Sequence, residues 1–93
     1  MGQEIIVSRH ESAVEFIRAE RPELADAPVI ASATEADVAG KNVYGNIPYA
    51  LAAVAEVVTA VEFDGDPPRG REYGVQEMRA AGAVLRSYEV RRI

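Results

Sequence analysis

Short runs of β-branched and aromatic residues recur along the chain and predict its strands. These runs lie at residues 4–8, 28–32, 41–45, 57–63 and 87–90. The run at 57–63 shows the two-residue alternation of a β-strand, and the run at 4–8 is typical of a buried strand. The chain therefore begins with a strand and returns to strand structure four more times.

Helical spacing of apolar residues predicts a helix directly after the first strand. The segment 12–20 places its apolar side chains on one face. Ser12, with Glu15 three residues later, forms the sequence pattern of a capping box, so we expect Ser12 to be the N-cap. Pro22 cannot continue a helix, and the helix should end before it.

Three further helical segments separate the remaining strands. Residues 34–38 predict a single helical turn that stops at Gly40. Asn46-Ile47-Pro48 predicts the start of a second helix, because Asn46 is a good capping residue and Pro48 is favoured near the first helical position. Residues 75–84 predict the last helix.

The alternation of strands and helices predicts the fold class. Strand–helix–strand units favour an α/β fold, with a mostly parallel sheet of about five strands flanked by helices. No repeat or linker divides the chain, so we expect residues 1–93 to form a single domain.

Composition narrows the class of protein. The 93 residues are 48% hydrophobic, a fraction too high for an intrinsically disordered chain. The sequence includes no cysteine, which excludes disulfides, a cysteine nucleophile and thiolate metal sites. The first residues lack the pattern of a signal peptide, and no apolar run is long enough to cross a bilayer. We therefore expect a soluble, cytoplasmic protein that does not interact with membranes.

Charge is distributed unevenly along a chain of net charge −5. Residues 1–66 carry four basic and twelve acidic side chains, whereas residues 67–93 carry six arginines and three glutamates. An acidic protein is a poor binder of duplex DNA or RNA. The arginines of the last segment suit phosphate contacts, but for any single one of them a solvated helix face paired with the acidic half is the favoured interpretation.

Two polar segments follow strands that should end at the same edge of the sheet. The first predicted strand ends in Ser8-Arg9-His10, and the third ends in Gly45-Asn46-Ile47-Pro48. Ligands of open parallel sheets bind outside the carboxyl ends of the strands, where helix N-termini attract anions. The two segments together predict a pocket for a phosphate-bearing ligand.

His10 is the only histidine of the chain. Imidazole can donate or accept a proton near neutral pH, so His10 is a candidate general acid or base. A surface histidine that binds only the neighbouring backbone is an equally good interpretation. A lone histidine without cysteine does not make a zinc site, and we expect no bound metal.

The order of short motifs along the chain is similar to that of a known family. Ser8-Arg9-His10 is followed by Ala13, Glu15 and Phe16, then by Gly45, Pro48, Leu51 and Ala52, then by Arg69-Gly70-Arg71-Glu72, and finally by Met78, Gly82-Ala83 and Leu85. This order resembles that of the small Csx-type accessory proteins of type III CRISPR loci, and the resemblance covers almost the whole chain.

The resemblance implies a Rossmann-like fold and a ring nuclease. Such enzymes linearise cyclic oligoadenylate, chiefly cyclic tetra-adenylate, and so end the antiviral response. The implied reaction is attack of a ribose 2′-OH on the neighbouring phosphodiester, and it needs neither a metal nor another cofactor. The implied working unit is a homodimer, because the ligand is symmetric.

The resemblance also implies roles for individual residues. Arg9 would hold the phosphate, and His10 would transfer a proton. Ligand contacts would come from Ser8, Gly45, Asn46 and Pro48, while Arg69 and Arg71 would close over the ring. A protein that binds the ring without cleaving it, and an interaction protein without a nucleotide ligand, are the alternative interpretations.

Overall fold

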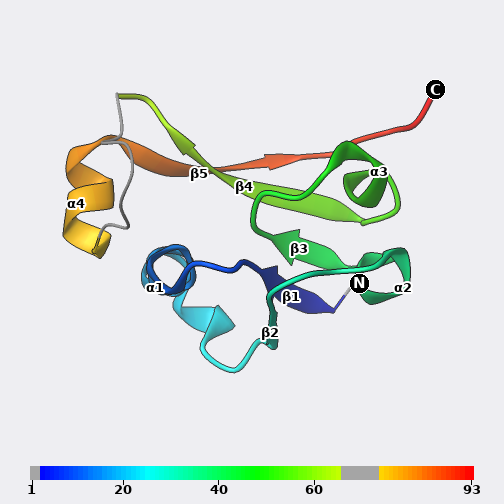
Figure 1. The fold of residues 1–93 in the computed structure, drawn as a ribbon, viewed down its shortest axis with the longest axis horizontal. Coiled ribbons are helices and arrows are strands. Elements are labelled where there is room, and N and C mark those ends of the chain that lie inside the picture. The colour runs from blue at the N-terminus through cyan, green and yellow to red at the C-terminus, as the bar shows by residue number, and fades with distance from the viewer. Residues whose placement is uncertain (1–2, 66–73) are drawn as a thin grey trace.

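A five-stranded sheet forms the centre of the computed structural model, which describes residues 3–65 and 74–93 (Figure 1). The order of the strands across the sheet is β2-β1-β3-β4-β5. Their bounds are β1 Glu4–Val7, β2 Val29–Ile30, β3 Asn42–Tyr44, β4 Val57–Phe63 and β5 Ala83–Tyr88. The predicted Arg69 and Arg71 contacts lie outside the described residues.

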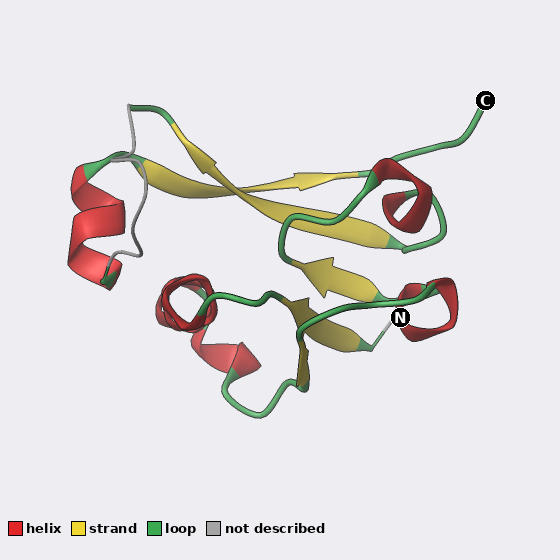
Figure 2. Ribbon diagram, in the orientation of Figure 1, coloured by secondary structure: helices red, strands yellow, loops and turns green. Residues whose placement is uncertain are grey.

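The direction of the strands confirms the predicted fold class. The strands β2, β1, β3 and β4 are parallel, whereas β5 runs antiparallel to β4, from Val58 opposite Tyr88 to Phe63 opposite Ala83. Helices flank the sheet on both sides (Figure 2). The protein is an α/β protein with a mostly parallel sheet, which is compatible with a Rossmann-like fold.

The helical segments are short apart from the first. Their bounds are α1 Glu11–Glu20, the 3₁₀ turn Pro22–Leu24, α2 Glu35–Val38, α3 Tyr49–Ala52 and α4 Val75–Ala80. As predicted, α1 ends before Pro22 and α2 ends before Gly40. The strands β1 and β3 are parallel, and each is followed by a turn into a helix. Both turns therefore lie at the carboxyl edge of the sheet.

The sheet separates two apolar cores. One core lies under α1 and α4, where the strand residues Ile6 and Val61 pack with the fully buried Phe16. The other lies under α2 and α3, where Val43 packs with Val38. Figure 1 shows the same division, with α1 beside α4 and α2 beside α3. The alternation of side chains along each strand supplies both cores at once.

Two predicted helix caps are wrong. The N-cap of α1 is His10, not Ser12, and the N-cap of α3 is Pro48, not Asn46; neither helix has a side-chain cap bond. In contrast, α2 has a complete capping box, because Thr34 and Asp37 bond each other's backbone N–H. The Asn46 side chain instead bonds the backbone of Val61.

The predicted helix at 75–84 is too long, because its last residues belong to β5. The chain turns at Gly82, whose φ of 85° favours glycine. A Cβ at Gly82 would lie 2.8 Å from the backbone nitrogen of Gly65, so these two segments of the chain pass very close to each other. The amide of Asp64 donates to the carbonyl of Gly82 (2.9 Å), which begins the antiparallel pairing with β4.

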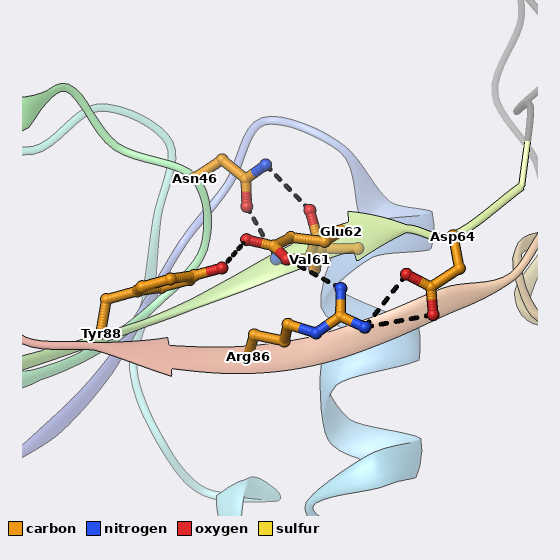
Figure 3. Close-up of polar contacts among 6 residues, drawn as sticks. All are labelled: Asn46, Val61, Glu62, Asp64, Arg86 and Tyr88. Carbon is orange, nitrogen blue, oxygen red and sulfur yellow. Dashed lines mark hydrogen bonds and ion pairs between the residues drawn. The ribbon is translucent and has the colours of Figure 1, made fainter.

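A polar cluster of Glu62, Asp64, Arg86 and Tyr88 joins β4 to β5 (Figure 3). The Arg86 guanidinium donates to Glu62 (3.0 Å) and lies 3.0 Å from the Asp64 carboxylate. The Tyr88 hydroxyl donates to the other oxygen of Glu62. These hydrogen bonds, first from Tyr88 and then from Arg86, lower the pKa of Glu62 below its ordinary value.

Tyr88→Phe is expected to raise the pKa of Glu62, because it removes a hydrogen bond to the charged carboxylate. A lowered native pKa contributes stability above the unfolded value of about 4.3, and this contribution is lost as the pH falls through the native value. The variant should therefore differ most from wild type in Tm near neutral pH and least in acid. Carboxyl NMR titration measures the shift directly, and the matched Tyr44→Phe should leave the pKa of Glu62 unchanged.

Within the described part of the chain, no helix is both long enough and apolar enough to cross a membrane.

Candidate functional site

A pocket of about 920 Å³ opens at the carboxyl edge of the sheet. Its walls include Val7 at the end of β1 and residues 8–10 after it, residues 31–33 after β2 and residues 45–48 after β3. In the order β2-β1-β3, the chain leaves β1 to one side for β2 and then returns to the other side for β3. The pocket therefore lies at the reversal of strand order, where ligands of open α/β sheets bind.

Gly45 allows the turns after β1 and β3 to come together. It has a φ of 137°, and a Cβ built on it would lie 2.0 Å from the carbonyl oxygen of Val7. Its own amide donates to the carbonyl of Thr59 on β4 (2.9 Å). Only a residue without a side chain can pass so close to Val7, and both residues line the pocket.

The Ser8-Arg9-His10 turn forms the polar rim of the pocket. The Ser8 hydroxyl accepts a hydrogen bond from the His10 amide (3.1 Å) and donates to the His10 carbonyl (3.3 Å), which closes a tight turn before α1. Arg9 donates from Nη2 to the Oγ of Ser32 (3.0 Å). Arg9 and His10 are both exposed, and the guanidinium of Arg9 reaches across to the loop after β2.

Asn46 fixes the second turn to β4. Its Nδ2 donates to the carbonyl of Val61 (3.1 Å), and its Oδ1 accepts from the amide of Val61 (2.8 Å) (Figure 3). The side-chain amide thus continues the β3–β4 pairing past the end of β3. Its two polar groups bind the backbone of β4, so in this structure Asn46 positions the pocket wall.

The structure brings most of the predicted site residues into one pocket. The residues predicted from sequence that line it are Ser8, Arg9, His10, Gly45, Asn46 and Pro48. Sequence reasoning missed Ser32, which contacts Arg9, and the apolar residues Phe63 and Met78, which also line the pocket. The position of Ser32 at the carboxyl end of the second predicted strand is the signal that would have indicated it.

The chemical groups at the rim are a guanidinium, an imidazole and hydroxyls. Among residues 3–65 and 74–93, no three or more His, Cys, Asp or Glu side chains come together as metal ligands would. The first turn of α1 follows the rim directly, and Ser12 and Ala13 of that turn line the pocket. A helix N-terminus beside an exposed arginine favours an anionic ligand.

Comparison with known proteins identifies the family. No curated protein and no solved structure matches the chain. A family model described as "Putative CRISPR-associated protein (Cas_VVA1548)" matches residues 5–91, from β1 to beyond β5. The match therefore includes the Ser8-Arg9-His10 turn, Gly45 and the whole pocket described above. The chain belongs to this family of CRISPR-associated proteins.

Proposed function

We propose that this CRISPR-associated protein is a ring nuclease that cleaves cyclic oligoadenylate, preferably cyclic tetra-adenylate. The observation that carries the proposal is a pocket at the strand-order reversal with Arg9 and His10 side by side on its rim. By linearising the second messenger, the activity would switch off type III CRISPR signalling. The family membership supports the CRISPR context, and the geometry supports binding of a phosphodiester.

Binding would rest on the rim and on the start of α1. The Arg9 guanidinium presents planar donors that suit phosphate oxygens, and its bond to Ser32 holds it over the pocket. The first turn of α1 adds the positive end of the helix dipole. This arrangement accounts for an anion site on a protein of net charge −5.

The proposed reaction is an internal displacement at phosphorus. The ribose 2′-oxygen attacks the adjacent phosphorus, and its proton passes to a base; the P–O5′ bond breaks, and the leaving oxygen takes up a proton. The products carry a 2′,3′-cyclic phosphate and a 5′-hydroxyl. His10 is the candidate for one of these proton transfers, and Arg9 would stabilise the charge that develops on the phosphorane oxygens.

Incubation of the protein with cyclic tetra-adenylate in EDTA tests the activity. We expect linear di-adenylate with a 2′,3′-cyclic phosphate end, detected by chromatography and mass spectrometry. Intact ring after prolonged incubation with excess protein would contradict the proposal. Tight binding in calorimetry together with recovery of the unchanged ring would instead identify a protein that sequesters the messenger.

A homodimer is the working unit that a symmetric ring favours. Light scattering with and without the ring measures the oligomeric state, and the calorimetric stoichiometry should be one ring to two chains. One ring bound by each monomer would contradict the dimeric unit while leaving the cleavage reaction in place.

A further inference from the structure

The pocket lining also includes apolar side chains that the phosphate chemistry of the rim does not use. They are Val61 and Phe63 of β4, Ala13 and Ile17 of α1, and Met78 of α4. These five side chains, which we call the apolar lobe, carry no charge and no hydrogen-bond donor. The lobe therefore requires a ligand part that is itself apolar or aromatic.

The walls of the lobe are already in place in the protein. Ile17, Val61 and Met78 are buried within the core under α1 and α4, and the half-buried Phe63 packs against that core. An ion pair between Arg79 of α4 and Glu20 of α1 (2.8 Å) links the two helices beside the lobe. A lobe built on the core is preorganised, so a ligand need not order it.

We propose that the apolar lobe binds a purine base of the ligand whose phosphate lies at Arg9. This inference rests on the proposed function, because it assigns part of the same cyclic oligoadenylate. One continuous pocket holds an anion-binding rim and an apolar lobe, and a nucleotide joins an anionic phosphate to an aromatic base in the same way. Inorganic phosphate would fill the rim alone.

The chemistry of the lobe also determines how the base is recognised. Ala13 and Phe63 are half-buried and supply the apolar surface for dispersion contacts, whereas Ile17, Val61 and Met78 are buried. Because the side chains of the lobe carry no donor, they favour a base by its flat apolar area more than by its hydrogen-bonding edge. A ring of adenylates should thus bind more tightly than a ring of uridylates with the same backbone.

Calorimetry with a 2′-fluoro analogue of cyclic tetra-adenylate tests the inference, since this ring lacks the nucleophile and stays intact. Phe63→Leu keeps an apolar side chain but removes the aromatic ring, and it should weaken binding roughly 5- to 150-fold. Ala13→Leu fills the lobe without deleting any core atoms, and it should weaken binding as well. The matched control is Phe16→Leu, because Phe16 lies in the same core but does not line the pocket.

Three outcomes separate this inference from the proposed function. Weaker binding in Phe63→Leu and Ala13→Leu but not in Phe16→Leu, with NMR contacts between adenine protons and the Met78 methyl group, supports a base in the lobe. Unchanged affinity in both lobe variants overturns the inference and leaves the ring nuclease in place. A wild-type protein that does not bind the ring overturns both. If Phe63→Leu fails to fold, Ala13→Leu and the NMR contacts decide.

Discussion

Arg9→Ala should slow cleavage of cyclic tetra-adenylate by roughly 10²- to 10³-fold, the cost of losing one donor to a developing oxyanion. Among the pocket-lining residues in 3–65 and 74–93, Arg9 is the one arginine or lysine. Its hydrogen bond to Ser32 directs the guanidinium across the ends of the strands. Loss of the guanidinium removes stabilisation that is greatest in the transition state, so the rate should fall more than the affinity.

His10→Ala should slow the same step by roughly 10²- to 10⁴-fold, the range for loss of a positioned acid or base. His10 lines the pocket next to Arg9 and is the N-cap residue of α1. The His10 side chain makes no cap hydrogen bond to α1, so the substitution removes no helix cap. Thermal unfolding of the variant separates an effect on stability from an effect on the chemical step.

Single-turnover rates with protein in excess provide the measurement for both variants. Arg91→Ala is the matched control, because Arg91 is exposed and does not line the pocket. Arg9→Lys keeps the charge but not the planar fork, and it should restore only part of the rate. Wild-type rates in Arg9→Ala and His10→Ala would remove these residues from the reaction.

Gly45→Ala should destabilise the fold by about 3 kcal/mol or more, from the sum of backbone strain and a backbone clash. The new Cβ would lie 2.0 Å from the Val7 carbonyl oxygen, and a backbone atom cannot turn away as a flexible side chain can. Either β1 and β3 separate or the turn reorganises, and both changes disturb the pocket. For a domain of this size we expect Tm to fall by more than about 10 °C.

Gly40→Ala is the matched control for this prediction. Gly40 also has a positive φ, of 68°, but nothing lies within 4 Å of a Cβ built there. This variant has only the backbone cost, about 1 kcal/mol. Thermal unfolding followed by circular dichroism compares the two. Equal losses of Tm at both positions would show that the close approach of Gly45 to Val7 does not contribute to the loss of stability.

Much of the fold could be predicted from local pattern alone. The run at 57–63 matches β4 residue for residue, and α1 ends before Pro22 as expected. In both cases the signal is local, since alternation and a missing amide act within a few residues. The candidate site was also predictable in part, because the turns after parallel strands meet at one edge of the sheet.

The segment at 81–84 shows where local pattern is insufficient. Ala81-Gly82-Ala83-Val84 suits the end of a helix as well as the start of a strand. Ala83 and Val84 form the start of β5 because they pair with β4, a segment distant in sequence. The hydrogen bond from the Asp64 amide to the Gly82 carbonyl begins this antiparallel pairing. The energy of that pairing comes from a neighbour that no local window contains.

Asn46 shows the same limit at the level of one side chain. Its sequence position suits a helix cap, but the backbone of Val61 offers a donor and an acceptor at the spacing of its amide. Two hydrogen bonds at the end of a sheet replace one at a helix start. Sequence places the amide in the turn, and only the adjacent strand determines which partner it takes.

The sequence by itself determined the α/β class and the polar turn Ser8-Arg9-His10 at the end of the first strand, because both depend on neighbours along the chain. The tertiary structure decided that Arg9 meets Ser32, and that Phe63 lines the same pocket. These residues are distant along the chain, and the strand order β2-β1-β3-β4 brings the segments that carry them to neighbouring positions in the sheet.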